Sequence, residues 1–275
     1  MNTKVLFNQI KKKQSFLCVG LDINQDLFPD KLRDDPNKIF NFCKSIIDAT
    51  AEYCVAYKIN IAFFEAYGVK GWNYLEKITD YLNNYYPDMF TIADAKRADI
   101  GNTSKRYAKA FFDHLNFNSI TVVPYMGVDS VEPFLNYKER YTILLALTSN
   151  RGAADFQLLS LGDKKLYEHI IETSIKWKNS DQLMFVVGAT RPDALIKIRK
   201  LIPENFLLVP GIGAQGGNLE DVANNGLNHQ CGILVNSSRA IIYASKENNY
   251  DEKAGLEAKQ IQQKMKDLLF KHNII

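Results

Sequence analysis

The chain has 275 residues, of which 46% are hydrophobic, enough for one large domain of the α/β barrel type or for two small ones. Its 34 basic and 31 acidic residues leave a net charge of +3, which favours neither nucleic acid nor a membrane surface as a partner. The segment from Met1 to Lys13 lacks the apolar core of a signal peptide, and no apolar run approaches membrane-spanning length. Four cysteines without a C-x-x-C pair suit a reducing compartment. These features predict a globular, cytoplasmic protein.

Apolar segments of strand length recur along the chain, and most of the gaps between them have helical periodicity. Ile39, Cys43, Ile46 and Thr50 show this period before the second segment. Strands that alternate with helices indicate parallel β/α units, and eight units in this length predict a closed (β/α)₈ TIM barrel. A doubly wound open sheet is the alternative. The predicted strands are residues 16–22, 54–60, 90–96, 119–125, 141–148, 183–189, 206–210 and 231–236, and a closing helix is predicted over 254–270.

No low-complexity tract, internal repeat or Pro/Gly-rich linker interrupts the chain, so residues 1–275 are predicted to form a single domain. In a barrel of this type the chemistry lies at the C-terminal ends of the strands. Polar residues occur at those positions in this sequence, which favours a site there over isolated strand caps. They are Asp22 after the first strand, Lys58 in the second, Asp94 and Lys96 at the end of the third, and the segments 148–152 and 188–190 after the fifth and sixth.

The segment from Phe90 to Ser104 places two carboxylates and a lysine at the end of an apolar run. Side chains alternate along an extended strand, so Asp94 and Lys96 are expected to point the same way. Asp99 follows in a stretch of loop composition and must reach them from a loop or from another subunit. The structural alternative is an ion pair at a strand end, followed by a helix cap at Asn102 or Thr103.

A glycine-rich turn over residues 210–217 follows the seventh strand, and a helical pattern begins just after it, near Asn218. The backbone N–H groups of such a turn can approach an anion closely. Arg239, after the eighth strand, can bind a phosphate through two hydrogen bonds. The loops after strands seven and eight of such barrels commonly bind phosphate. The predicted phosphate loop comprises Gly211, Gly213, Gln215, Gly216, Ser238 and Arg239, and an ordinary flexible turn is the alternative.

Together these motifs closely resemble the orotidine 5'-phosphate decarboxylase family. The resemblance runs in order from about residue 16 to residue 242 and is most specific in the phrase Asp94-Ala-Lys-Arg-Ala-Asp-Ile-Gly-Asn-Thr103. It also includes Val19-Gly-Leu-Asp22, Lys58-Ile-Asn60 and Asn236-Ser-Ser-Arg239. The resemblance implies a TIM barrel, a homodimer, no cofactor, and conversion of orotidine 5'-phosphate to uridine 5'-phosphate and carbon dioxide.

The resemblance also implies roles for individual residues. Lys58, Asp94, Lys96 and Asp99 match the family's charged catalytic tetrad, with Asp99 reaching across the dimer. Ile100 and Thr103 match positions that enter the partner's site. The remaining matches are substrate contacts: Asp22 and Lys58 to the ribose, Ser149 to the pyrimidine, and Gln215 with Arg239 to the phosphate.

The chemistry itself indicates what Lys96 does. Loss of carbon dioxide from C6 of the pyrimidine leaves a carbanion, which an ammonium group can stabilise and then protonate. The four histidines lack metal-ligand spacing, so no metal is expected. Two other functions remain open: a related metal-dependent sugar-phosphate decarboxylase, and a catalytically silent protein that binds a phosphoribosyl ligand.

Overall fold

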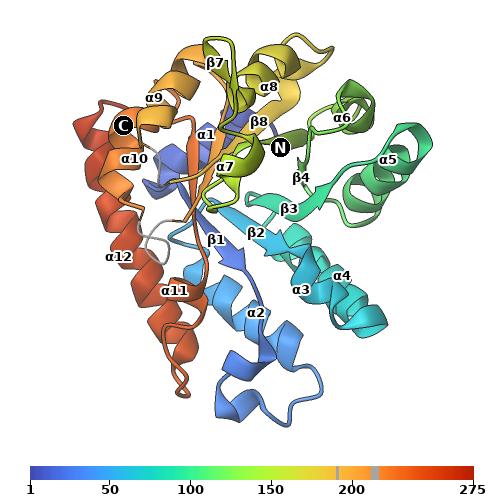
Figure 1. Ribbon diagram of the computed structural model, residues 1–275. Helices are drawn as coiled ribbons and strands as arrows, with labels where there is room; N and C mark the ends of the chain where they lie inside the picture. Colours follow the sequence, from blue (N-terminus) through green and yellow to red (C-terminus); the bar gives the residue numbers. More distant parts are fainter. Residues whose placement is uncertain (190–191, 212–216) are drawn as a thin grey trace. The chain divides into compact units, whose positions relative to one another are not determined.

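The computed structural model describes residues 1–189, 192–211 and 217–275. Eight strands close a barrel in the order β1-β10-β9-β8-β5-β4-β3-β2 (Figure 1). The pairs β1–β2, β2–β3, β4–β5, β5–β8 and β8–β9 are parallel. The barrel strands are β1 (Leu17–Leu21), β2 (Ala56–Asn60), β3 (Phe90–Arg97), β4 (Ser119–Val122), β5 (Tyr141–Leu147), β8 (Leu183–Val187), β9 (Leu207–Pro210) and β10 (Ile233–Ser237).

Helices connect the barrel strands, as expected for β/α units, and further helices precede β1 and follow β10. They are α1 (Thr3–Lys13), α2 (Lys38–Thr50), α3 (Ile61–Glu65), α4 (Gly68–Tyr85), α5 (Gly101–Ala108), α6 (Val128–Leu135), α7 (Ala153–Phe156), α8 (Leu166–Ser174), α9 (Pro192–Leu201), α10 (Leu219–Gly226), α11 (Arg239–Ile242) and α12 (Tyr250–Lys271). Short 3-10 turns occur at η1 (Gln25–Leu27), η2 (Asp30–Leu32) and η4 (Ser180–Gln182).

The prediction of a (β/α)₈ barrel is confirmed, and the open sheet is excluded because the strand order closes on itself. Each of the predicted strand segments overlaps one barrel strand. Strands β1 and β8 are buried along their whole length. Strands of a parallel barrel are covered on both faces, which explains why they read as continuous apolar runs.

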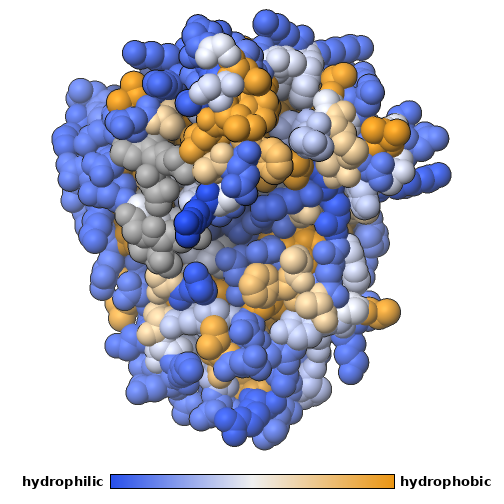
Figure 2. All heavy atoms as spheres, in the orientation of Figure 1, coloured by the Kyte–Doolittle hydropathy of each residue, from blue (hydrophilic) through white to orange (hydrophobic). Residues whose placement is uncertain are grey.

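An antiparallel hairpin interrupts the alternation between β5 and the next barrel strand. Its two strands, β6 (Ser160–Leu161) and β7 (Lys164–Lys165), form a two-stranded antiparallel sheet of their own. Strand β5 therefore pairs with β8. Exposed apolar side chains occur on this segment, with Phe156 64%, Leu159 49% and Leu161 50% exposed. Figure 2 shows a hydrophobic patch over α7 and the hairpin on an otherwise mainly hydrophilic face.

The chain divides into two compact units, each with its own packing. Unit 1 comprises residues 1–95, 115–117 and 236–275, and in it α12 packs on α2 while Phe42 stacks on Phe28, Tyr243 and Tyr250. Unit 2 comprises residues 96–114 and 118–235, and in it α5 packs on α6 and α9 on α10. That the whole chain acts as a single domain stays a prediction.

The basic run Lys11-Lys-Lys13 ends helix α1. Lys11 and Lys12 are exposed, whereas Lys13 is partly buried and its Nζ donates to the backbone oxygens of Ala51 and Cys54, each at 2.9 Å. Burial lowers the pKa of Lys13. This lysine therefore donates to two backbone carbonyl groups that need hydrogen-bond donors.

All four cysteines, Cys18, Cys43, Cys54 and Cys231, are free thiols and buried. Burial raises the pKa of Cys54 to about 11 and that of Cys231 to about 12, so both are neutral near pH 7. Neutral, buried thiols pack as small apolar groups and react slowly. Among the described helices, none combines the length and apolarity needed to cross a bilayer.

Candidate active site

An ammonium group, Lys58 Nζ, is buried between two carboxylates. It lies 2.9 Å from Asp94 Oδ2 and 3.4 Å from Asp22 Oδ1, and Lys58 is 4% exposed. Burial alone would lower the pKa of Lys58, but the charges of Asp94 and Asp22 outweigh it and hold that pKa above its usual value. Lys58 is therefore a cation near neutral pH despite its lack of hydration.

The strand register brings these three residues together. Lys58 pairs with Gly20 of β1, and Asn60 pairs with Asp94 of β3. Asp22 directly follows β1. Each side chain is thus carried by one of three successive barrel strands near its C-terminal end, where such barrels gather their polar residues. Two carboxylates, from Asp22 and Asp94, therefore meet the Lys58 ammonium.

Lys96 lies near the end of β3 in a left-handed backbone conformation, with φ of 47°. That conformation costs a residue with a side chain about 1–2 kcal/mol. Asp94 and Lys96 were expected to point the same way from an extended strand, but the backbone at Lys96 is not extended. Its backbone N–H donates to Thr121 Oγ1 at 2.9 Å, so a side chain accepts the bond in place of a backbone carbonyl. The Lys96 side chain is exposed.

Asp99 lies in the loop between β3 and α5, as predicted. Its Oδ1 accepts a hydrogen bond from the backbone N–H of Ile100 at 2.7 Å. Ser104 fixes the same loop, because its hydroxyl donates to the Asp99 carbonyl and accepts from the Asp99 N–H at 3.2 Å. Ile100 is 59% exposed and Thr103 is also exposed, so both present side chains at the surface.

The structural alternative placed a helix cap at Asn102 or Thr103, and the structure does not have it there. Helix α5 begins at Gly101, and its N-cap residue is Ile100, which makes no side-chain capping bond. Gly101 has φ of +52°, a conformation that glycine adopts without steric cost, and this allows the chain to turn into the helix earlier. The helix continues as a single π-helical segment, η3 (Lys109–His114).

Ser149 follows β5 and rests on Gly188, which follows β8. A Cβ atom at Gly188 would come within 2.8 Å of the backbone of Ser149, so only glycine fits there. Gln157 fixes Thr148, the residue before Ser149, through hydrogen bonds. Its Oε1 accepts from the Thr148 N–H at 2.8 Å, and its Nε2 donates to Thr148 Oγ1 at 3.0 Å.

The predicted phosphate loop is described only in part, because Gly213, Gln215 and Gly216 lie outside the described residues. Gly211 has φ of 99° and accepts a hydrogen bond from the N–H of Gly217 at 3.2 Å. Helix α10 begins directly afterwards with Asn218 as its N-cap, which confirms the helix predicted there.

Arg239 begins helix α11 and its side chain is exposed. The preceding residue, Ser238, accepts a hydrogen bond from Asn236 Nδ2 at 3.1 Å. Gly20 of β1 leaves room for the side chains of Asn236 and Ser238, because a Cβ there would come within 1.9 Å of Ser238 Oγ. The close approach to Gly20 thus fixes Asn236 and Ser238, the residues that lead to Arg239.

Of the predicted residues, the structure brings Asp22, Lys58 and Asp94 into direct contact within unit 1. Lys96, Asp99 and Ser149 belong to unit 2. Their assembly with the three residues of unit 1 into one site stays a prediction. Across the described ranges, no group of three or more His, Cys, Asp or Glu side chains is arranged to hold a metal ion.

Sequence reasoning missed Thr121 and Gln157, the two side chains that support predicted site residues. Each acts on the backbone of a neighbouring segment, and neither belongs to a charged or glycine-rich motif. Thr121 lies within an apolar run that reads only as a strand. Gln157 lies between apolar residues in a segment whose helix, α7, has only four residues.

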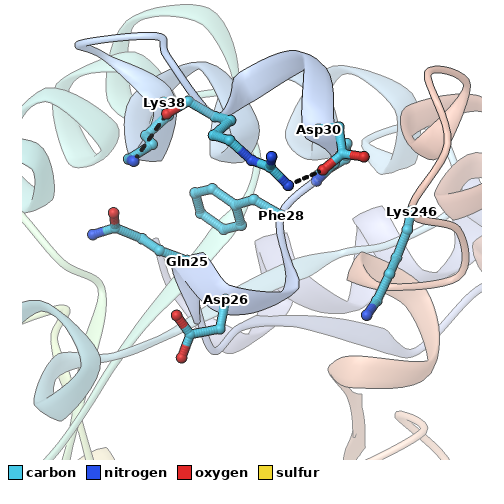
Figure 3. Close-up of a pocket in the computed structure, with 8 residues that line it drawn as sticks. Gln25, Asp26, Phe28, Asp30, Lys38 and Lys246 are labelled. Carbon is cyan, nitrogen blue, oxygen red and sulfur yellow. Dashed lines mark hydrogen bonds and ion pairs between the residues drawn. The ribbon is translucent and has the colours of Figure 1, made fainter.

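A cavity of about 410 Å³ lies elsewhere in unit 1, beside the segment that follows β1 (Figure 3). It contains none of the predicted site residues. Arg33 and Asp30 form an ion pair at 2.6 Å on its wall, with side chains 74% and 87% exposed. The full lining is Gln25, Asp26, Phe28, Pro29, Asp30, Arg33, Lys38 and Lys246.

A closed (β/α)₈ barrel with charged side chains at the ends of successive strands defines the class of TIM-barrel enzymes. The family model described as orotidine 5'-phosphate decarboxylase / HUMPS family matches residues 15–252. The chain belongs to this family.

Relatives match over nearly the whole chain. The orotidine 5'-phosphate decarboxylase of Christiangramia forsetii is 60% identical over 265 residues, covering 96% of this chain and 97% of that protein. The enzyme of the same name from Bacteroides fragilis is 54% identical over 270 residues, covering 98% of each. The solved structure of Leishmania donovani OMP decarboxylase is similar with a TM-score of 0.84 and 37% identity, covering 98% of this chain and all of that one.

Proposed function

We propose that this chain decarboxylates orotidine 5'-phosphate to uridine 5'-phosphate and carbon dioxide, a step of pyrimidine biosynthesis, without a cofactor. One observation supports this most directly: Lys58 is buried and charged between Asp22 and Asp94. Asp94 lies two residues before Lys96 in the motif typical of the family. Burying ionised groups costs stability. A chain that keeps such an array commonly uses it at a functional site.

Lys96 is the proton donor. When the bond from C6 to the carboxylate breaks, the electron pair stays on C6, and the ammonium of Lys96 lowers the energy of that anion. Lys96 then transfers its proton to C6, and this proton takes the place of the lost carboxylate. In this mechanism the charge develops close to a cation that is already in position, so little reorganisation is needed.

Asp94 faces the substrate carboxylate, and Lys58 holds Asp94 in place. A pair of opposite unit charges about 4 Å apart gains about 4 kcal/mol at an effective dielectric of about 20. The alternating charges of Lys58, Asp94, Lys96 and Asp99 keep the array near neutral. Repulsion between Asp94 and the substrate carboxylate disappears as carbon dioxide leaves, but stabilisation of the carbanion by Lys96 supplies the larger share of the rate.

The remaining predicted residues bind the substrate. Asp22 and Lys58 hold the ribose hydroxyls, and Ser149 contacts the pyrimidine. The phosphate is bound by the turn that contains Gly211, Gly213, Gln215 and Gly216, together with Ser238 and Arg239. The energy of phosphate binding holds the loops after the fifth and seventh barrel strands closed over the base.

The enzyme acts as a homodimer in the cytoplasm, and each site takes Asp99, Ile100 and Thr103 from the partner. Exposed apolar side chains just before α5 and α6, two helices of unit 2 that pack on each other, support an interface there: Ile100 is 59%, Tyr125 87% and Met126 46% exposed. Apolar side chains gathered at a surface commonly mark a contact with another protein chain. The four buried free thiols suit a reducing compartment.

Substitution of Lys96 tests the proposed chemistry. Lys96→Ala is expected to abolish turnover of orotidine 5'-phosphate, followed as loss of its ultraviolet absorbance, because the proton donor is gone. Binding of uridine 5'-phosphate, measured by calorimetry, is expected to persist. Lys259→Ala changes an exposed lysine on α12 and is the control. Near-normal turnover by Lys96→Ala would disprove the role given to this lysine.

A further inference from the structure

The backbone at Lys96 is unusual for a strand residue. Among the described residues, Lys96 is the one non-glycine residue with positive φ that lies inside a strand. The others, such as Gln14 at the end of α1 and Asn179 before η4, lie at helix ends or in connecting segments. A left-handed conformation places the Cβ of a residue close to its own carbonyl oxygen and persists only where neighbouring contacts impose it.

Thr121 on β4 makes such a contact. Its Oγ1 accepts the hydrogen bond from Lys96 N at 2.9 Å, and Thr121 is 1% exposed. One residue further along, the Arg97 carbonyl accepts from the N–H of Val123 at 3.1 Å, so backbone pairing resumes directly after Lys96. The threonine hydroxyl therefore bridges the single position at which the backbone of β3 turns out of the regular strand.

We propose that Thr121 is a positioning residue for the decarboxylation, which holds Lys96 in its left-handed conformation and thereby directs Nζ toward C6. This role rests on the proposed function of Lys96. The direction of the side chain depends on φ, because rotation about the N–Cα bond moves Cβ relative to the strand. If the Thr121 acceptor is lost, the Lys96 N–H is left without this partner, and the backbone relaxes toward an extended conformation that moves the ammonium away from the substrate.

Thr121→Val tests the proposal, because valine has nearly the same shape as threonine but no hydrogen-bond acceptor. The expected result is a fall in kcat of about tenfold or more, because a proton donor displaced by about 1 Å loses much of its effect. The KM for orotidine 5'-phosphate is expected to change less than about threefold, since Lys96 acts mainly in the transition state. Thr121→Ser keeps the hydroxyl and is expected to restore most of kcat.

Thr142→Val is the matched control. Thr142 lies on β5, where its neighbour across the β4–β5 pair is Ile120, and it is completely buried. Among the described residues its hydroxyl has no hydrogen-bond partner, so this substitution removes a buried hydroxyl without removing a described hydrogen bond. Its kcat is expected to equal that of the wild type. If Thr142→Val lowers kcat as much as Thr121→Val does, the effect belongs to the core and the proposal is overturned.

The remaining outcomes separate this proposal from the proposed function. If Lys96→Ala is inactive while Thr121→Val keeps the wild-type kcat, the role of Thr121 is overturned and that of Lys96 stands. If Thr121→Val raises KM and leaves kcat unchanged, the role is overturned as well. If Lys96→Ala itself remains active, the failure lies with the proposed function. Thr121→Ala replaces Thr121→Val if thermal unfolding shows that the valine variant does not fold.

Discussion

At the scale of the residue, Lys58 decides whether the charged group in unit 1 is stable. Its Nζ contacts Asp94 and Asp22, whose side chains are 10% and 20% exposed, so neither carboxylate is fully hydrated. The Lys58 ammonium offsets the repulsion between these two carboxylates. Removing one charge of this group therefore leaves the others partly buried without that compensation.

Lys58→Met removes the ammonium and keeps most of the apolar stem. We expect a loss of about 3 kcal/mol in the free energy of unfolding, near the lower end of the range for breaking a buried ion pair, because both carboxylates keep some contact with water. Turnover is expected to fall as well. Urea denaturation and the absorbance assay measure the two effects.

Lys164→Met is the matched control, since Lys164 forms an ion pair with Glu172 at 2.7 Å but its side chain is 39% exposed. Exposed pairs contribute little to stability. Equal losses of stability for the Lys58 and Lys164 variants would contradict the view that burial makes the Lys58 contacts important.

At the scale of the element, the segment after β5 is organised by Gln157. This residue connects the start of the loop, at Thr148, to helix α8, because its backbone carbonyl accepts from the Tyr167 N–H at 3.1 Å. Gly188 packs closely against the backbone of Ser149 in the same loop. The loop proposed to contact the pyrimidine is therefore held at two points by residues that have no contact with the substrate in the proposed function.

Gln157→Leu is expected to raise the KM for orotidine 5'-phosphate about tenfold, which corresponds to about 1.4 kcal/mol. Loss of the amide leaves the Thr148 N–H without its acceptor, so the loop no longer has a fixed position. Steady-state kinetics measure the change. Gln157→Glu keeps an acceptor and is expected to recover much of the affinity, while Ala154→Ser, on the exposed side of α7, changes nothing. An unchanged KM for Gln157→Leu would show that the clamp is dispensable.

The sequence predicted the elements of this fold more completely than their ends. Strands such as β8 are apolar throughout, so burial on both faces leaves a pattern that needs no tertiary information. The start of α5 at Gly101 was missed because it depends on a positive φ at that glycine. The π-helical segment from Lys109 was missed too, since its spacing of apolar residues differs little from that of an α-helix.

In the candidate site, the charged residues were predicted and their supports were not. Asp22, Lys58 and Asp94 stand out because ionisable groups at the ends of apolar strands need a reason to be there. Thr121 and Gln157 act through hydrogen bonds to the backbone of segments 25 and 9 residues away. Such contacts are set by how strands and loops meet in space, and no local pattern in the sequence encodes them.

At the scale of the whole molecule, the proposed function requires two chains. Mixing inactive Lys96→Ala and Asp99→Ala proteins is expected to restore activity, because one site of each mixed dimer then carries neither substitution. Mixing Lys96→Ala with Asp94→Ala is the control and is expected to restore none, since in the proposed site both residues come from the same chain. The absorbance assay measures turnover, and native mass spectrometry verifies that subunits have exchanged. No recovery in the first mixture, with exchange verified, would contradict a site built from two chains.

The burial of every native thiol gives the molecule a practical property. A single cysteine introduced at an exposed position, such as Phe156 on α7, would be attacked by a maleimide dye long before the four native ones. A fluorophore attached there would test whether the segment after β5 moves during turnover, without the need for a cysteine-free background.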